Sequence, residues 1–241
     1  MSKILVIPDT HLKPKIFDLA DKIMHEHEVD YAVQLGDNFD DFYCFEPEYK
    51  AHYARMEQFA KDHPNTIWLY GNHEVSYIIH RPVTGNTIWG HQYSFYYHQG
   101  IFEPKFIHLD GKVVFSHSGI FQEFIDETFK NPPTSVKQLI EFLNNPLLVP
   151  FSAYWCDNSP IWARPQYDSL TFPRLLNGYL QVVGHTPLKE ITKTNNIIST
   201  DVFSTSWGKR IASEKLIIID TKTLQHKTID IDFKKEFGET R

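Results

Sequence analysis

The stretch LYGNHEVSY (residues 69–77) places polar side chains directly after an apolar run. The run has the composition of a buried strand, and the glycine after it permits a tight turn. A turn needs only a glycine and one polar residue, whereas here an amide, an imidazole and a carboxylate follow one another as Asn72, His73 and Glu74. The stretch therefore predicts a strand whose end carries reactive chemistry.

The first half of the chain alternates between short apolar runs and segments of helical periodicity. We predict three strands (3–8, 31–36 and 66–71) and two helices (15–27 and 48–64). Strands that alternate with helices indicate parallel pairing through right-handed crossovers. This half predicts an α/β fold.

The second half has a different pattern. A hairpin is predicted at residues 106–119 around Asp110 and Gly111, and a helix at 135–145. We expect residues 146–173 to form a structured loop region with short helical pieces. Further strands are predicted within residues 179–185, 190–200 and 214–232, the last with a turn at Thr221 to Thr223. We expect one domain, residues 1–241.

Composition excludes several classes of protein. Of 241 residues, 41% are hydrophobic, and no apolar run approaches the roughly 20 residues that span a bilayer, so a membrane protein is excluded. The formal net charge is −6 and no block of basic residues occurs, which disfavours a dedicated nucleic-acid binder.

The N-terminal stretch MSKILVIPDTH has no secretory signal pattern, and we expect a cytoplasmic protein. Cys44 and Cys156 are far apart in the sequence and predict two free thiols.

Polar residues of the same chemical kind follow several of the predicted strands. The carboxyl ends of strands in an open α/β sheet line the crevice where ligands bind, so these residues can converge. Carboxylates, imidazoles and an amide oxygen are ligands of borderline transition metals, and they suit a two-metal centre. A single histidine or a single GD pair has an ordinary structural explanation, whereas the ordered set does not. The set is Asp9, His11, Asp37, Asn72, His73, His117 and His185.

The polar residues lie in five short motifs, which are DTH (9–11), GDNFDD (36–41), GNHE (71–74), SHSG (116–119) and GHTP (184–187). In this order the motifs resemble the signature of the calcineurin-like metallophosphoesterases. The resemblance extends over residues 9–187 and implies a four-layer αββα sandwich with mixed sheets and a dinuclear metal site at the sheet edges.

The resemblance also implies metal ligands. Two divalent cations are expected, with manganese first and iron or zinc as alternatives. They would activate a bridging water for direct attack on phosphorus. The first metal would be held by Asp9, His11 and Asp37, and the second by Asp37, Asn72, His117 and His185, with Asp37 bridging.

The same resemblance assigns His73 as the general acid, because a departing alkoxide needs a proton. Asp40 would orient His73. For Glu74 a capping or supporting role is expected rather than metal ligation.

Two features concern the branch of the family. GHTP has Pro187 where many members have a second histidine, and it resembles the bacterial and phage Ser/Thr phosphoprotein phosphatases and the symmetrical diadenosine tetraphosphate hydrolases. In that branch an arginine of a similar Trp-x-Arg setting binds phosphate, which points to Arg164, although Arg164 packed on Trp162 would serve only structure. Asp41 stands where the branch has another phosphate-binding arginine, and Arg81 is a possible substitute.

The first functional hypothesis is a metal-dependent phosphomonoesterase acting on phosphoserine or phosphothreonine in proteins. The alternative is a hydrolase of dinucleoside polyphosphates or other nucleotides, with bases stacked on an aromatic cluster. A phosphodiesterase or nuclease comes third, and a non-catalytic interaction module is disfavoured because every expected ligand type is present. The aromatic cluster is Tyr154, Trp155, Trp162 and Tyr167.

Overall fold

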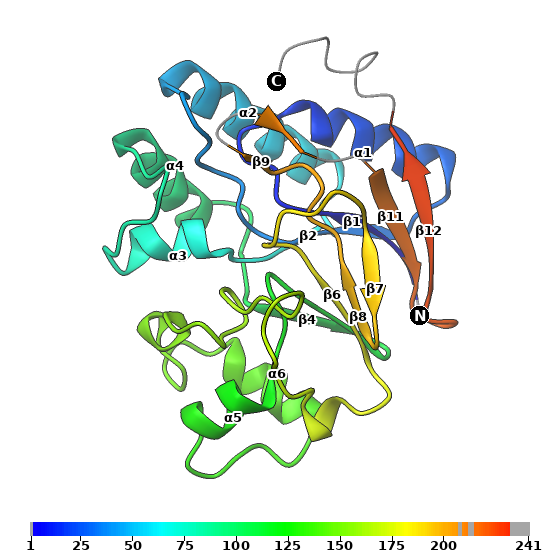
Figure 1. The fold of residues 1–241 in the computed structure, drawn as a ribbon. Helices are drawn as coiled ribbons and strands as arrows, with labels where there is room; N and C mark the ends of the chain where they lie inside the picture. The colour runs from blue at the N-terminus through cyan, green and yellow to red at the C-terminus, as the bar shows by residue number, and fades with distance from the viewer. Residues whose placement is uncertain (1, 207–208, 212–214, 232–241) are drawn as a thin grey trace.

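Two five-stranded mixed sheets form the centre of the computed structural model, which describes residues 2–206, 209–211 and 215–231 (Figure 1). The ends of the predicted segment 214–232 and of the predicted domain 1–241 lie outside these residues. The first sheet has the order β12-β11-β1-β2-β3. Its strands are β1 (Lys3–Ile7), β2 (Tyr31–Gln34), β3 (Ile67–Trp68), β11 (Lys215–Asp220) and β12 (Gln225–Asp230).

Strands β1, β2 and β3 are parallel, as the sequence predicts, and β11 joins β1 in antiparallel register. The predicted turn at Thr221 to Thr223 connects β11 to β12.

The second sheet has the order β4-β5-β6-β8-β7. The predicted hairpin is formed by β4 and β5, and β5, β6 and β8 are parallel. Its strands are β4 (Ile107–Asp110), β5 (Val113–Ser116), β6 (Leu180–Val183), β7 (Thr192–Thr194) and β8 (Ile197–Ser199). A small separate ribbon pairs β9 (Thr205–Ser206) with β10 (Lys209–Arg210).

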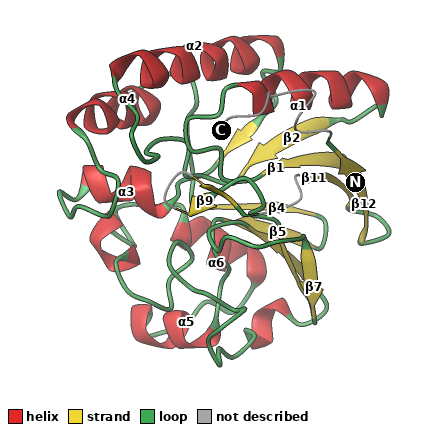
Figure 2. Ribbon diagram, turned by 45° about the horizontal axis from the view of Figure 1, so that its top comes forward, coloured by secondary structure: helices red, strands yellow, loops and turns green. Residues whose placement is uncertain are grey.

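Helices lie on the outer side of each sheet (Figure 2). The first sheet is covered by α1 (Lys15–Glu26) and α2 (Glu46–Asp62), and the second by α5 (Gln122–Thr128) and α6 (Val136–Leu143). The predicted four-layer sandwich with mixed sheets is therefore confirmed. Two further helices, α3 (Asn72–Ile78) and α4 (Ile88–Gln99), pack together at one side of the sandwich.

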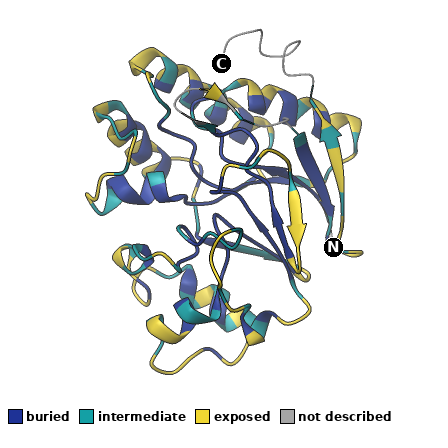
Figure 3. Cartoon of the chain, in the orientation of Figure 1, coloured by how far each residue is buried: buried dark blue, intermediate teal, exposed yellow. Residues whose placement is uncertain are grey.

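The alternation of side chains along β1 accounts for the layers. Ile4 and Val6 point into the space between the sheets, where they share a cluster with Phe115 of β5. Leu5 and Ile7 belong to the cluster that contains the buried faces of α1 and α2. Figure 3 shows the same division, with dark, buried central strands, exposed edge strands β7 and β12, and exposed outer faces on the helices.

Helices α3, α4 and α5 were not predicted. The segment of α4, IWGHQYSFYYHQ, has aromatic and polar residues without a single apolar stripe, so periodicity does not reveal it. The Thr87 side chain caps this helix by accepting a hydrogen bond from Gly90 N. In the predicted loop region only a short 3-10 helix, Phe151–Tyr154, occurs, and a second, Arg174–Leu176, follows it.

Cys44 and Cys156 form no disulfide bond, as predicted. None of the helices in the described part of the chain has the length and apolar character needed to cross a membrane.

Candidate metal centre and active site

The ends of β1, β2, β5 and β6 and the start of α3 meet around one cavity of about 290 Å³. Most of the predicted site residues line it or lie directly behind its wall. The lining includes His11, Asp37, Asp40, Asn72, His73, Arg164 and His185. The sequence pattern of polar residues after strands thus corresponds to one place in the fold.

One group of potential metal ligands consists of Asp9, His11 and Asp37, whose ligand atoms all lie within 4.8 Å of one another. His11 Nδ1 donates a hydrogen bond to the carbonyl oxygen of Asp40 at 2.8 Å. A carbonyl can only accept, so Nδ1 carries the proton and Nε2 presents its lone pair to the site. His11 Nε2 lies 4.0 Å from Asp37 Oδ2, a separation that leaves room for a cation.

The second group consists of Asp37, His117 and His185, again within 4.8 Å. His117 Nδ1 donates to the carbonyl oxygen of Leu35 at 2.9 Å, so Nε2 is the ring nitrogen that can coordinate a metal once it is deprotonated. This Nε2 lies 3.0 Å from Asn72 Oδ1 and 3.1 Å from His185 Nδ1. Asp37 belongs to both groups, as a residue that bridges two metals would.

The residues fit a pair of cations. Asp9, Asp37 and His117 are buried, and His185 Nε2 is enclosed without a hydrogen-bond partner among the described residues. Burial raises the pKa of Asp9 well above its usual value, and Asp201 nearby raises it further. Carboxylates and imidazoles clustered out of water are costly unless a positive ion compensates them.

Four residues that line the cavity adopt left-handed backbone conformations, with φ of 39° at His11, 52° at Asp37, 70° at Asp40 and 65° at His185. Such conformations cost energy for residues other than glycine and concentrate at functional sites. Gly71 is required by close approach, because an added Cβ would lie 2.1 Å from Asp37 Oδ1.

Glu74 holds the loops together. Its Oε2 accepts hydrogen bonds from Asp37 N and Gly71 N, both at 2.9 Å, and its Oε1 accepts one from Asn38 N at 2.7 Å. The side chain therefore caps backbone groups, as expected. The opening stretch thus combines a close-packed glycine, an amide facing the metal groups, an imidazole at the cavity and a carboxylate that ties two loops.

His73 and Asp40 form a pair at the cavity. His73 Nδ1 lies 3.0 Å from Asp40 Oδ2, and His73 N donates to Asp37 Oδ1 at 3.0 Å. Burial lowers the pKa of His73, but Asp37 and Asp40 outweigh it and raise the pKa to about 9. These two carboxylates therefore favour the protonated form of the imidazole.

Of the two candidate phosphate ligands, only one lines the cavity. Arg164 does so, and its Nη1 donates to Thr186 Oγ1 at 3.4 Å. Arg81 is exposed and does not belong to the lining; its backbone N donates to Ser76 O.

Asp41 is paired at the cavity rim. Lys13 Nζ lies 3.0 Å from Asp41 Oδ2, and Thr205 Oγ1 donates to Asp41 Oδ1 at 3.0 Å. Burial raises the pKa of Asp41, but Lys13 outweighs it and lowers the pKa below its usual value. The carboxylate is ionised and already neutralised by its partner.

The predicted aromatic cluster is divided. Tyr154 is fully buried and stacks on Phe106, so it belongs to the core. Trp162 lines the cavity, with its ring edge-on to His185, and Trp155 packs edge-on behind Trp162. Tyr167 is 71% exposed and lines a second hollow beside the cavity.

Asp201 was missed by the sequence reasoning. It is fully buried, its Oδ1 accepts from Ser204 N, and its Oδ2 has no hydrogen-bond partner among the described residues. Its charge influences the pKa of both Asp9 and His11, which places it beside the first metal group. The sequence pattern could have revealed Asp201, because it comes shortly after the apolar run of β8, just as the predicted site residues come after the apolar runs of other strands.

A model of the calcineurin-like phosphoesterase family matches residues 2–196 of the sequence. The chain belongs to the calcineurin-like phosphoesterases. With its ligand groups brought together at one cavity, it is a metal-dependent phosphoesterase. Comparison with curated proteins finds no match.

Several solved structures share the fold of this phosphoesterase. A mutant of a cold-active protein tyrosine phosphatase has a TM-score of 0.57 and 18% identity, covering 95% of this chain and 81% of that one. A cold-active protein-tyrosine phosphatase from a psychrophilic Shewanella species has a TM-score of 0.52, with the same identity and coverage. A hypothetical protein of Pyrococcus horikoshii OT3 has a TM-score of 0.51 and 15% identity, covering 99% and 91%.

Proposed function

We propose that this phosphoesterase hydrolyses phosphate monoesters, and that its substrates are phosphoserine and phosphothreonine in proteins. The observation that carries the proposal is the pair of His73 and Asp40 at the cavity. With Nδ1 engaged by Asp40, His73 has Nε2 available to protonate a leaving oxygen. Such a proton matters most for an alkoxide, the leaving group of a serine or threonine ester.

We assign the metal ligands as the resemblance implied. Asp9, His11 and Asp37 would hold one cation, and Asp37, Asn72, His117 and His185 the other, with manganese as the proposed metal. Two bound cations in such a site supply an activated water and positive charge for the phosphoryl oxygens.

The chain's own residues perform the remaining tasks. Arg164 would bind phosphoryl oxygens through its planar guanidinium, and Trp162 and Pro187 would exclude water beside it. The bond between phosphorus and the ester oxygen breaks as the water oxygen bonds to phosphorus. His73 gives a proton to the departing alkoxide and takes up the proton that the attacking water releases, so alcohol and inorganic phosphate result.

A second candidate is hydrolysis of nucleotides. A hollow of about 400 Å³ adjoins the cavity and shares Arg164, Phe42 and Pro187 with it. Tyr167 in this hollow presents an exposed ring on which a base could stack.

Turnover on manganese-loaded protein distinguishes these candidates when a phosphoserine peptide, diadenosine tetraphosphate and an aryl phosphodiester are compared at equal concentration. The proposal predicts the highest kcat/KM on the peptide. Preference for diadenosine tetraphosphate would transfer the assignment to nucleotides, and preference for the diester would contradict both.

A further inference from the structure

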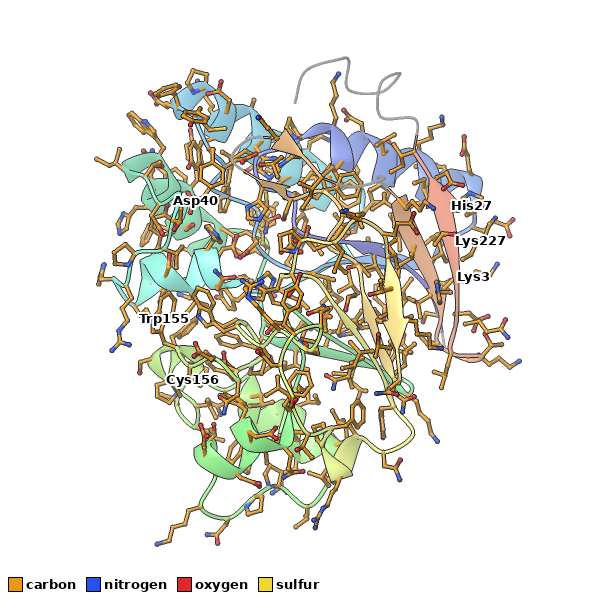
Figure 4. All side chains as sticks on the ribbon, in the orientation of Figure 1. Lys3, His27, Asp40, Trp155, Cys156 and Lys227 are labelled. Atoms are coloured by element: carbon orange, nitrogen blue, oxygen red, sulfur yellow. The ribbon has the colours of Figure 1, made fainter. Side chains whose placement is uncertain are left out.

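Asp40 has a second set of partners besides His73. Its Oδ2 faces His73, whereas its Oδ1 accepts hydrogen bonds from two tyrosine hydroxyls, Tyr49 of α2 at 2.8 Å and Tyr77 of α3 at 2.7 Å. Asp40 itself is 2% exposed. Figure 4 shows Asp40 on the side of the molecule formed by α3 and α4, whereas Trp155 lies on the loop below α3.

The direction of these hydrogen bonds is fixed by Thr87. Its Oγ1 lies 2.9 Å from the Tyr49 hydroxyl, and its backbone N donates to the Tyr77 hydroxyl at 2.8 Å. The Tyr77 oxygen thus accepts from Thr87 N and gives its own proton to Asp40. Burial and the charge of Asp40 raise the pKa of both phenols, so they stay protonated and remain donors.

Asp40 and the Tyr77 hydroxyl pack tightly against the start of α4. A Cβ added at Gly90 would lie 2.0 Å from the Tyr77 hydroxyl and 2.3 Å from Asp40 Oδ1. Thr87, which caps α4, comes two residues after Gly85. The loop residues Val83, Thr84 and Gly85 line the cavity. The tyrosines therefore join Asp40 to the helix that carries one wall of the cavity.

This wall lies beside His73. A Cβ added at Gly85 would lie 4.0 Å from His73 Cε1 and 3.6 Å from Asp40 Cβ. Asn86 Nδ2 donates to Ser76 Oγ, which in turn donates to His73 O at 2.7 Å. The same segment is thus tied to the backbone of the imidazole that it flanks.

We propose that Tyr49 and Tyr77 are positioning residues for proton donation by His73, an inference that rests on the proposed function. By occupying Oδ1, the two hydroxyls fix the carboxylate so that Oδ2 faces His73 Nδ1. The His73 proton to be donated is then held on Nε2, toward the leaving oxygen.

A merely structural role for the hydroxyls gives a different expectation. Loss of a buried hydrogen bond alone would lower stability and would affect every substrate equally. Loss of positioning affects those substrates whose leaving oxygen needs a proton. A phosphoserine peptide needs that proton, whereas the p-nitrophenolate of p-nitrophenyl phosphate departs without it.

The test measures kcat on both substrates for manganese-loaded wild type, Tyr77→Phe, Tyr49→Phe and the double variant, with metal content determined for each. We expect each single variant to lose about tenfold on the peptide relative to p-nitrophenyl phosphate, and the double variant to approach the ratio of His73→Ala. In the His73→Ala background, Tyr77→Phe should cause no further change in the ratio, because the two residues act through one proton transfer.

Tyr97→Phe is the matched control. Tyr97 is a fully buried tyrosine of α4 whose hydroxyl donates to Leu69 O at 2.8 Å, away from Asp40. It should lose stability without a change in the substrate ratio.

Each outcome decides a different claim. An unchanged ratio in folded, metal-loaded Tyr49→Phe and Tyr77→Phe would overturn the positioning role and leave the proposed function standing. If one tyrosine variant fails to fold, the other decides. No turnover by wild type on either substrate would overturn the proposed function, and the positioning role with it.

Discussion

Lys13 Nζ lies 3.0 Å from Asp41 Oδ2 at the rim of the catalytic cavity, and only 11% and 15% of these two side chains are exposed. In the phosphatase branch that the sequence motifs resemble, a phosphate-binding arginine stands at the position of Asp41, and an unpaired carboxylate there would repel a phosphate. The pair removes that repulsion without supplying a positive charge. Lys13 therefore makes an aspartate tolerable at this position.

Lys13→Ala should raise KM for a phosphoserine peptide about five- to tenfold, because an uncompensated carboxylate about 4 Å from a phosphate charge costs about 1 kcal/mol where water screens the two charges. The double variant Lys13→Ala with Asp41→Asn should recover most of the loss, since it removes the exposed charge. Steady-state kinetics at fixed ionic strength measure both. A double variant as weak as Lys13→Ala would show that Lys13 acts on the substrate by itself.

Arg164→Ala should raise KM, and the inhibition constant of inorganic phosphate, by about ten- to a hundredfold, the worth of a charge-assisted pair. Arg81→Ala is the control, because Arg81 is exposed and lies outside the cavity lining. Its constants should stay within about twofold of wild type. An equal rise of KM in both variants would contradict the assignment of Arg164, and not Arg81, as the residue that binds phosphate.

Asp37→Asn should lose both metals, because Asp37 belongs to both ligand groups, whereas Asp9→Asn should lose mainly the first. Elemental analysis after dialysis against metal-free buffer measures the metal content per chain, and circular dichroism verifies folding. Two metals retained in Asp37→Asn would contradict the bridging position.

Metal affinity should rise with pH between about 6.5 and 9. Burial lowers the pKa of His117, but Asp37 and Asp9 outweigh it and raise the pKa to about 9. His117 must lose its proton to bind a metal, so each pH unit in this range favours binding by up to about tenfold. Isothermal titration calorimetry in buffers of different ionisation enthalpy reports the proton released, and release of none would contradict the assignment of His117.

The raised pKa of His117 also affects the stability of the chelated protein, which should fall as pH rises, whereas metal affinity increases. A histidine with a raised folded pKa stabilises the fold below its unfolded pKa of 6.5, and that contribution is lost as pH rises toward about 9. The Tm of chelated protein should therefore fall over this range more steeply than that of metal-loaded protein.

The strands and the cluster of candidate metal ligands were predictable from sequence because both depend on local patterns. Apolar runs mark the strands, and polar residues such as Asp9 and His185 follow them directly. Helix α4 was not predictable in this way, since its aromatic residues lack a period and its stability comes from packing on α2 and α3. Tertiary contacts override local preference in such segments.

Pairings across long sequence separations could not be read from the chain either. The contact between Lys13 and Asp41, the bond from Thr205 to Asp41, and the two tyrosines on Asp40 join residues from different elements. They depend on how the loops fold over the sheet edge, which no local motif records.

Metal-dependent hydrolysis of a phosphomonoester is tested directly by turnover of a phosphoserine peptide, with protein that is first freed of metal by a chelator and then titrated with Mn²⁺. Turnover should be lost on chelation and should recover in full at about two equivalents of Mn²⁺ per chain. Turnover that survives complete metal removal, or that fails to return at any Mn²⁺ concentration in folded protein, would contradict metal-dependent hydrolysis.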